Sequence, residues 1–282
     1  MTRPAAARRG QRLEPPGPPV IVRARRLVTV TGVSGGLGAS VLAAAVAVRA
    51  AAAGLRVAAV DLDPLGGGLD VTFGAEQSPG LRWPDLLTLE GAADGAALRA
   101  SLPEPDGVGL LSHTREGDQP DGREMVAHVV EALRADGDLV VVDLPLGVPA
   151  ATSVLATADT AVLLAGVQLR HLAALAVAAT VVRSAAHGRP TSDAGRGADY
   201  RGPLSARADL VVCLRDERGA ADVTGFVGEE LDLPVLGVLG DDRGLRADLV
   251  HGLAPGTRRG PLTSLADLVL GRVMLGQGEG AA

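Results

Sequence analysis

The chain alternates short runs of aliphatic residues with longer segments that have the apolar spacing and alanine content of helices. The runs predicted as strands are Leu27–Thr31, Val57–Asp61, 109–112, Leu139–Asp143, Thr160–Ala165, Leu210–Leu214 and Val235–Leu239. The segments predicted as helices are Ser40–Ala53, Glu124–Ala135, Leu172–Ser184, Ala221–Leu231 and Leu262–Met274. Continuous apolar strands that alternate with helices are typical of a parallel sheet buried on both faces. We therefore expect an α/β fold, a mostly parallel doubly wound sheet with helices on both faces.

This alternation is confined to residues 26–276, which we expect to form a single domain. Residues 1–25 are rich in Arg, Pro and Ala, and their composition predicts a disordered arm. Residues 187–207 are rich in Gly, Arg and Ser and are predicted to be a flexible loop. A short disordered tail is expected at 277–282.

The composition and the charge of the chain limit the cellular compartment and the kinds of partner that we expect. The net charge of −6 argues against a general polyanion binder, so DNA is an unfavoured partner. The single cysteine, Cys213, lies in an apolar run and is predicted to be buried, and one cysteine excludes a disulfide within the chain. The N-terminus lacks the apolar region of a signal peptide, and Asp159, Arg170 and His171 interrupt the longest candidate membrane span. We expect a cytoplasmic protein.

A glycine-rich loop follows the first predicted strand and leads into the first predicted helix. Its sequence is Thr31-Gly32-Val33-Ser34-Gly35-Gly36-Leu37-Gly38-Ala39-Ser40. Glycines at such a turn let backbone N–H groups converge on an anion at the helix N-terminus. The loop therefore predicts a phosphate site.

Two kinds of phosphate site match this loop. The spacing of Gly32, Gly36 and Gly38 fits short-chain dehydrogenases, with Asp61 as the acid that binds the ribose. Those enzymes need a Tyr-x-x-x-Lys pair, but this chain has no lysine and its one tyrosine, Tyr200, lies in the predicted flexible loop. The alternative is a deviant Walker A loop, which is also supported by the acids that end two later strands. These acids lie in the segments Asp61-Leu62-Asp63-Pro64 and Asp143-Leu144-Pro145.

These three segments, in this order, resemble the MinD/ParA family of P-loop ATPases. The resemblance implies a P-loop NTPase fold of the SIMIBI class, ATP or ADP as the ligand, and Mg²⁺. It implies that the nucleotide is bound by Gly32, Ser34, Gly35, Gly36, Leu37, Gly38, Ala39, Ser40 and Asp61. It also implies that Asp63 positions the attacking water, that Asp143 acts through the metal shell, and that Ser40, Asp63 and Asp143 hold the metal. The iron-protein branch of the superfamily is excluded, because it needs cluster cysteines.

Within that family the chain looks most like the actinobacterial CpaE/TadZ-type proteins, which are described as septum-site-determining or as neighbours of secretion and helicase genes. The resemblance covers about residues 26–275 and includes the segments 61–70, 80–86, 140–145 and 258–262. It implies a cytoplasmic protein, with a polar or septal position at the inner face of the membrane as one option. It also implies a nucleotide-sensitive homodimer whose partners are a pilus or secretion ATPase or division proteins.

The chain departs from the family pattern at both lysines of the loop. The family's lysines bind the β- and γ-phosphates and the partner subunit's nucleotide, but their positions here hold Ala39 and Ser34. A charge-assisted hydrogen bond contributes roughly 1.5–3 kcal/mol, so each loss is expected to weaken triphosphate binding by roughly ten- to a hundredfold. Phosphoryl transfer depends on fixed positive charge, so we expect weak hydrolysis at most.

Three further features have open interpretations. Arg82 and Arg170 are candidates to replace a missing lysine, or they are packing or surface arginines. Trp83, the only tryptophan, is either a core anchor under the loop that follows Asp61 or part of a partner-binding surface. The last predicted helix has an apolar face but only Asp267 and Arg272 as charges, so a membrane anchor is weakly supported and packing on the sheet is favoured.

The sequence thus predicts a nucleotide-binding protein of spatial regulation, acting at a septum or pole or in pilus or secretion-system assembly. One alternative is an active ATPase that cycles on membrane or DNA. Another is a nucleotide-free scaffold that retains only the fold.

Overall fold

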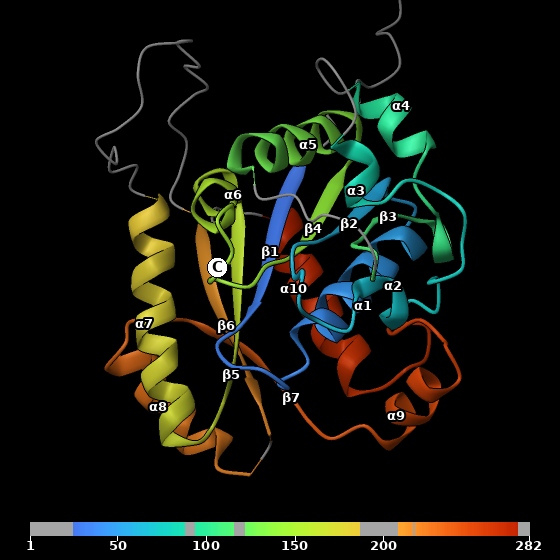
Figure 1. Ribbon diagram of the computed structural model, residues 1–282. Helices are drawn as coiled ribbons and strands as arrows, with labels where there is room; N and C mark the ends of the chain where they lie inside the picture. Colours follow the sequence, from blue (N-terminus) through green and yellow to red (C-terminus); the bar gives the residue numbers. More distant parts are fainter. Residues whose placement is uncertain (1–24, 88–93, 116–121, 187–207, 217, 276–282) are drawn as a thin grey trace, which may run out of the picture.

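The computed structural model describes residues 25–87, 94–115, 122–186, 208–216 and 218–275. Its centre is a seven-stranded sheet with the order β3-β2-β4-β1-β5-β6-β7, and every strand pair is parallel (Figure 1). The strands are β1 (Arg26–Gly32), β2 (Val57–Asp61), β3 (Val108–Leu111), β4 (Leu139–Asp143), β5 (Thr160–Gly166), β6 (Asp209–Arg215) and β7 (Val235–Leu239). The predicted α/β sheet is confirmed. The predicted arm, flexible loop and tail lie outside the described residues, apart from Arg25.

Helices cover both faces of the sheet. They are α1 (Ala39–Ala52), α2 (Leu69–Thr72), α3 (Trp83–Leu86), α4 (Gly95–Ala100), α5 (Arg123–Asp136), α6 (Ala151–Thr157), α7 (Leu169–Ala186), α8 (Ala220–Glu229), α9 (Arg243–Val250) and α10 (Pro261–Leu275), with a 3-10 turn η1 (Pro105–Gly107) before β3. The pattern predicted five of these. Helices α2, α3, α4, α6 and α9 were missed because they span only four to eight residues, too few for an apolar period to emerge.

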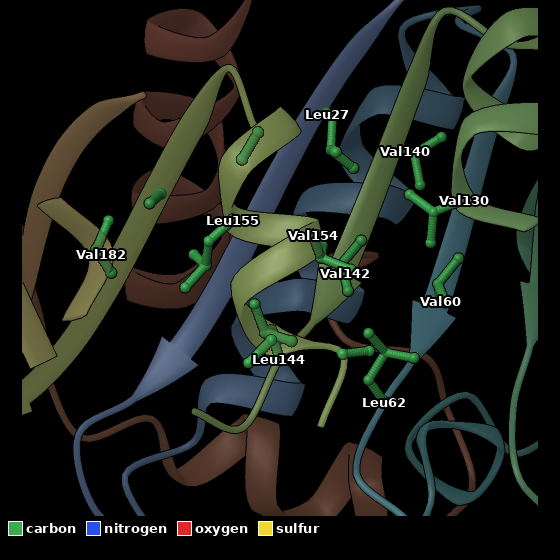
Figure 2. Packing of buried hydrophobic residues seen from close by; sticks show 14 of the residues in the cluster. Leu27, Val60, Leu62, Val130, Val140, Val142, Leu144, Val154, Leu155 and Val182 are labelled. Carbon is green, nitrogen blue, oxygen red and sulfur yellow. The ribbon is translucent and has the colours of Figure 1, made fainter. Parts of the chain in front are cut away.

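The core has two layers, one on each side of the sheet. On one side α1 and α10 pack against alternate strand residues such as Val28 and Val141. On the other side α5, α6, α7 and α8 pack against the intervening residues, such as Val140 and Val142. Figure 2 shows Val154 and Leu155 of α6 over this second face. Because side chains alternate along a strand, the four apolar residues of β4 before Asp143 contribute to both layers.

The last helix, α10, packs on β7 and β1, as the sequence predicted. Leu262, Leu265, Val269 and Val273 are buried there, although Leu268 of the predicted apolar face is half exposed. Ion pairs connect its two charges to the domain, since Asp267 pairs with Arg49 of α1 and Arg272 with Asp209 of β6.

The prediction that no apolar segment reaches the length of a membrane span is wrong for α7. Its 18 residues are long and apolar enough by length and composition to cross a bilayer. In this fold, however, α7 lies on β5 and β6 and buries Leu175, Ala179 and Val182 against the sheet. A core helix of an alanine-rich protein meets the same criterion as a membrane span, because alanine counts as apolar in both settings.

Candidate functional site

The three predicted segments meet at one edge of the sheet. Strand β4 lies between β2 and β1, and all three are parallel, so their carboxyl ends lie side by side. Asp143 is paired in register with Asp61 of β2 on one side and with Val30 of β1 on the other. From β1 the chain passes through α1 to one side of the sheet, and from β4 it passes through α6 to the other side. Ligands of open α/β sheets bind where the chain turns to opposite sides in this way.

The base of the glycine loop is fixed to the neighbouring strands. The hydroxyl of the buried Thr31 donates a hydrogen bond to the carbonyl oxygen of Leu144 at 2.7 Å. The backbone N–H of Val33 donates to the carbonyl oxygen of Leu164 at 3.0 Å. Leu37, in the middle of the loop, is buried. The loop is therefore held in place by the protein itself.

The N-terminus of α1 carries no internal cap. The residue before the helix, Gly38, has a φ of 95°, no side chain caps the first turn, and this turn contains no acid. A Cβ atom added at Gly35, Gly36 or Gly38 would meet nothing within 4 Å, so the space over the loop is open. The first N–H groups of a 14-residue helix then lack protein acceptors, and the helix dipole adds positive potential. This arrangement is a site for an anion.

Two of the predicted binding residues in the loop have unusual surroundings. The hydroxyl oxygen of Ser34 is buried and has no hydrogen-bond partner among the described residues. Ala39 is the first residue of α1, and its methyl group lies near Gly32, where an added Cβ would be 3.3 Å away. Buried polar atoms without partners are rare, and a serine hydroxyl beside an anion site can donate its proton to the anion.

Ser40 connects the helix to the acid at the end of β4. Its side chain forms a hydrogen bond with Asp143, whose side chain is buried beside Asp61 and Asp63. Burial raises the pKa of Asp143 to about 7, and the neighbouring charges of Asp61 and Asp63 act in the same direction, while the bond from Ser40 opposes the change. A carboxyl group with this pKa is protonated in half of the molecules near neutral pH unless a cation binds beside it.

Asp61 and Asp63 follow one another at the end of β2 but have different surroundings. Asp61 is buried, and its carboxylate accepts hydrogen bonds from the backbone N–H groups of Asp63 at 2.9 Å and Leu69 at 2.8 Å. Desolvation raises the pKa of Asp61 despite these bonds. Asp63 is only partly buried, and its carboxylate accepts a hydrogen bond from the N–H of Leu65 at 3.1 Å. Gly66 closes this turn, because a Cβ there would lie 2.7 Å from a carboxylate oxygen of Asp63.

Trp83 is a core anchor beneath the loop that follows Asp61, and it is not a partner-binding surface. Its side chain is fully buried, and its indole N–H donates to the backbone carbonyl oxygen of Asp61 at 2.7 Å. The indole ring lies 6.1 Å, centroid to centroid, from the imidazole of His113. The tryptophan thus positions the backbone that carries the two acids.

The two candidate replacements for the lysines have different positions. Arg82 is buried, and its guanidinium donates to the carbonyl oxygens of Ala75, Ser78, Gly80 and Leu81 at 3.0–3.4 Å. It is therefore a packing arginine. Arg170 is exposed in the first turn of α7, and its Nε donates to Nε2 of His171 at 3.3 Å.

A cavity of about 360 Å³ adjoins the glycine loop on the side away from the acids. Its lining comes from the loop and from the ends of three strands, namely Leu37, Gly166, Val167, Gln168, His171, Arg215, Asp216, Arg218 and Asp241. Leu37 is the one residue of this lining that the glycine-loop pattern predicts to belong to the site. The one signal that the sequence offers is their position after predicted strands, since the carboxyl ends of parallel strands share an edge.

The acids do not form a complete metal site by themselves. Within the part of the chain that the structure describes, no group of three or more His, Cys, Asp or Glu side chains is placed to hold a metal ion. A Mg²⁺ ion bound to phosphates takes one or two protein carboxylates and completes its octahedron with phosphate oxygens and water. Ser40, Asp63 and Asp143 fit that kind of shared site, while their roles remain predictions.

No model of a known protein family matches the chain. Its sequence is 38% identical over 246 residues to an uncharacterized protein of Mycobacterium tuberculosis, which is Rv3660c in one strain and MT3760 in another. The match spans 87% of this chain but 63% of the length of the relative.

Solved structures establish the fold. The ParA family ATPase of Chlorobium tepidum has a TM-score of 0.67 and is 16% identical, with 88% of this chain and 100% of that chain covered. MinD of Pyrococcus horikoshii, solved with Mg-ADP, has a TM-score of 0.64 and is 18% identical, with 88% and 98% covered. MinD of Aquifex aeolicus in complex with MinC has a TM-score of 0.64 and is 17% identical, with 88% and 96% covered. The chain has the fold of the MinD/ParA ATPases.

Proposed function

We propose that this protein binds ADP or ATP with Mg²⁺ at the glycine loop and acts as a nucleotide-sensitive switch with weak or no hydrolysis. The observation that carries the proposal is the uncapped start of α1 under an open glycine loop, beside two buried acids. The nucleotide-bound structures of this fold, MinD with Mg-ADP among them, support the choice of ligand.

The residues of the loop would hold the phosphates. The backbone N–H groups from Gly35 to Ser40 would donate hydrogen bonds to the phosphate oxygens at the start of the helix, and Gly38, with its φ of 95°, shapes the turn. The buried hydroxyl of Ser34 gains a partner if a phosphate oxygen lies above it. When bound, the nucleotide supplies the phosphate oxygens that complete a metal site.

The acids fit a divalent cation. Asp61 and Asp143 are buried with raised pKa values, and burying two carboxyl groups side by side costs free energy that a cation offsets. Ser40 and Asp143 would hold Mg²⁺ directly or through water, and Asp61 would keep the end of β2 in place. Asp63, which is less buried than Asp61 and Asp143, would position a water molecule at the phosphates.

The positions of the two missing lysines decide between a motor and a switch. Ala39 and Ser34 bring no positive charge to the loop, while transfer of a phosphoryl group needs charge stabilisation in the transition state. Binding in the ground state relies more on the backbone N–H groups and the metal, which are retained. Binding without efficient turnover follows from this difference.

In the cell, the switch would act in spatial regulation. We propose a CpaE/TadZ-like role in septum-site or polar localisation, or in pilus or secretion-system assembly, at the inner face of the membrane. A nucleotide-sensitive homodimer would recruit a division protein or a secretion ATPase. MinD of Aquifex aeolicus, solved in complex with MinC, is an example of this fold with a division partner.

The test compares wild type with Ala39→Lys and with Ala39→Met, which adds a side chain of similar length without the charge. Calorimetry with Mg·ATP should show binding by wild type, roughly ten- to a hundredfold tighter binding by Ala39→Lys, and no gain for Ala39→Met. A weak affinity that is unchanged in Ala39→Lys would mean that the missing charge at position 39 does not limit nucleotide binding. Wild-type hydrolysis stimulated by DNA or lipid would favour an active ATPase, and no thermal shift with millimolar Mg·ATP or Mg·ADP would favour an empty scaffold.

A further inference from the structure

The glycine loop lacks a cation, but Arg170 lies at the start of α7, and among the described residues only His171 contacts its guanidinium through a hydrogen bond. Chain connectivity and one hydrogen bond place this helix beside the loop. The N–H of Val33 bonds to Leu164 in β5, and β5 ends at Gly166, three residues before α7 begins. His171 of α7 and Leu37 of the loop line the same cavity of about 360 Å³. The first turn of α7 is therefore a neighbour of the phosphate site.

His171 is the fixed point of this turn. Its side chain is nine-tenths buried, and its ring packs on Gly166, where an added Cβ would be 2.2 Å from Nδ1. Nδ1 is buried and has no hydrogen-bond partner among the described residues. Only glycine at position 166 leaves room for the imidazole, so the ring cannot move aside without opening a gap against the end of β5.

His171 in turn orients Arg170. The Nε–H of Arg170 donates to Nε2 of His171 at 3.3 Å and does not use the two terminal nitrogens of the guanidinium. No described residue accepts a hydrogen bond from those nitrogens. A guanidinium that is oriented through Nε presents its fork to a phosphate with less loss of conformational freedom than a mobile side chain.

The other arginines near the glycine loop and the loop after β2 are engaged or unoriented. Arg82 is bound to four carbonyl oxygens, and Arg115 pairs with the buried Asp70 at 3.2 Å. Arg215 donates to the carbonyl oxygens of Leu239 and Gly240 and to Asp241. Arg218 lines the cavity, but no hydrogen bond orients its exposed side chain in the described structure.

We propose that Arg170, held by His171, binds the phosphate groups of the nucleotide and replaces the charge that the loop has lost. The inference rests on the proposed function, because it assumes a nucleoside di- or triphosphate at the glycine loop. Arg170 is then a phosphate-binding residue, and His171 is a positioning residue. The arginine binds the nucleotide of its own chain, because His171 and Leu37 of one chain line the same cavity.

The experiment measures affinity for Mg·ADP and for adenosine by calorimetry. Arg170→Ala should weaken Mg·ADP by about tenfold or more and leave adenosine unchanged, while Arg170→Lys should retain most of the affinity. Gly166→Ala, which displaces the imidazole without touching the arginine, should also weaken Mg·ADP. The matched control is Arg218→Ala, which removes an unoriented arginine from the cavity that His171 lines and should change affinity by less than about twofold.

A double-mutant cycle with Ala39→Lys tests the replacement itself. With lysine at position 39, removal of Arg170 should cost less than about threefold, because the lost charge is supplied from the loop. Equal losses in both backgrounds, or a loss for adenosine as large as that for Mg·ADP, would overturn the proposal. So would an unchanged Mg·ADP affinity in Arg170→Ala. Absence of Mg·ADP binding by wild type would instead refute the proposed function, so the two failures are distinguishable.

Discussion

The buried carboxyl group of Asp143 lowers the stability of the fold, and replacing Asp143 with asparagine should therefore raise it. Its side chain is 5% exposed, next to Asp61 and Asp63, and burial raises its pKa from 3.8 to about 7. Between these values the folded protein binds a proton that the unfolded chain has released. Stability therefore falls as pH rises from about 4 to 7 and is constant for this group above that.

The magnitude follows from the interval between the two pKa values. At about 1.4 kcal/mol for each pH unit, the ionised side chain costs on the order of 4 kcal/mol at pH 8. Asparagine has the same shape, still accepts the hydrogen bond from Ser40, and carries no charge. Asp143→Asn should thus be more stable than wild type at pH 8, and its advantage should shrink by about 2 to 3 kcal/mol at pH 5.

The assay is urea unfolding with EDTA and without nucleotide, followed by the fluorescence of Trp83, the only tryptophan. The matched control is Asp222→Asn, an exposed aspartate on α8, which should leave stability nearly unchanged at both pH values. A gain in the free energy of unfolding of Asp143→Asn that is the same at pH 5 and pH 8, or a loss at both pH values, would contradict this expectation. Either result would mean that burial of the charge on Asp143 does not lower the stability of the fold.

Three other substitutions have defined outcomes. Ser40→Ala removes the hydroxyl that forms a hydrogen bond with Asp143, so Mg²⁺ should no longer increase the affinity for ADP. Calorimetry of ADP with Mg²⁺ and with EDTA measures this difference. An undiminished effect of Mg²⁺ in the variant would contradict the prediction. Trp83→Phe removes the indole N–H that donates to the backbone carbonyl oxygen of Asp61 and should destabilise the fold by about 1–3 kcal/mol. Circular dichroism in urea measures the change in stability. An unchanged stability would mean that water replaces the indole as the donor. Arg82→Met keeps the bulk of the side chain but removes the donors to the carbonyl oxygens of Ala75 and Ser78, so it should lower the free energy of unfolding by at least about 2 kcal/mol. The protein that remains folded should bind Mg·ADP as tightly as wild type. A selective loss of Mg·ADP affinity would instead identify Arg82 as a phosphate ligand.

The sequence predicts the sheet well for a physical reason. Val57–Asp61, Leu139–Asp143 and Val235–Leu239 are predicted to the residue, because each apolar run begins after Arg56, Asp138 or Pro234 and ends at an aspartate or before Gly240. The short helices have no such signal. α9 buries none of its residues, and its start at Asp242, whose side chain caps the N–H of Leu245, depends on one local hydrogen bond.

The candidate site is predicted only in part, for a related reason. The glycines and the acids follow strands in sequence, and parallel pairing brings them together. The roles of Arg82 and Arg170 depend on which carbonyl oxygens or imidazole the fold places beside each guanidinium. Nothing in the two arginines' own sequence neighbourhoods distinguishes them, and the cavity lined by Gly166, His171 and Arg218 exists only after three strands are aligned.

We expect the glycine loop to bind nucleotide phosphates without a lysine, and calorimetry of Mg·ADP with one added side chain in the loop is the decisive experiment. Gly35 has space for a side chain and no left-handed backbone, so Gly35→Val fills the open loop with little strain. Gly225→Val makes the same change on the exposed surface of α8. Wild type and Gly225→Val should each bind one Mg·ADP per chain, and Gly35→Val should bind Mg·ADP at least about tenfold more weakly. No binding by wild type, or equal binding by Gly35→Val, would contradict it.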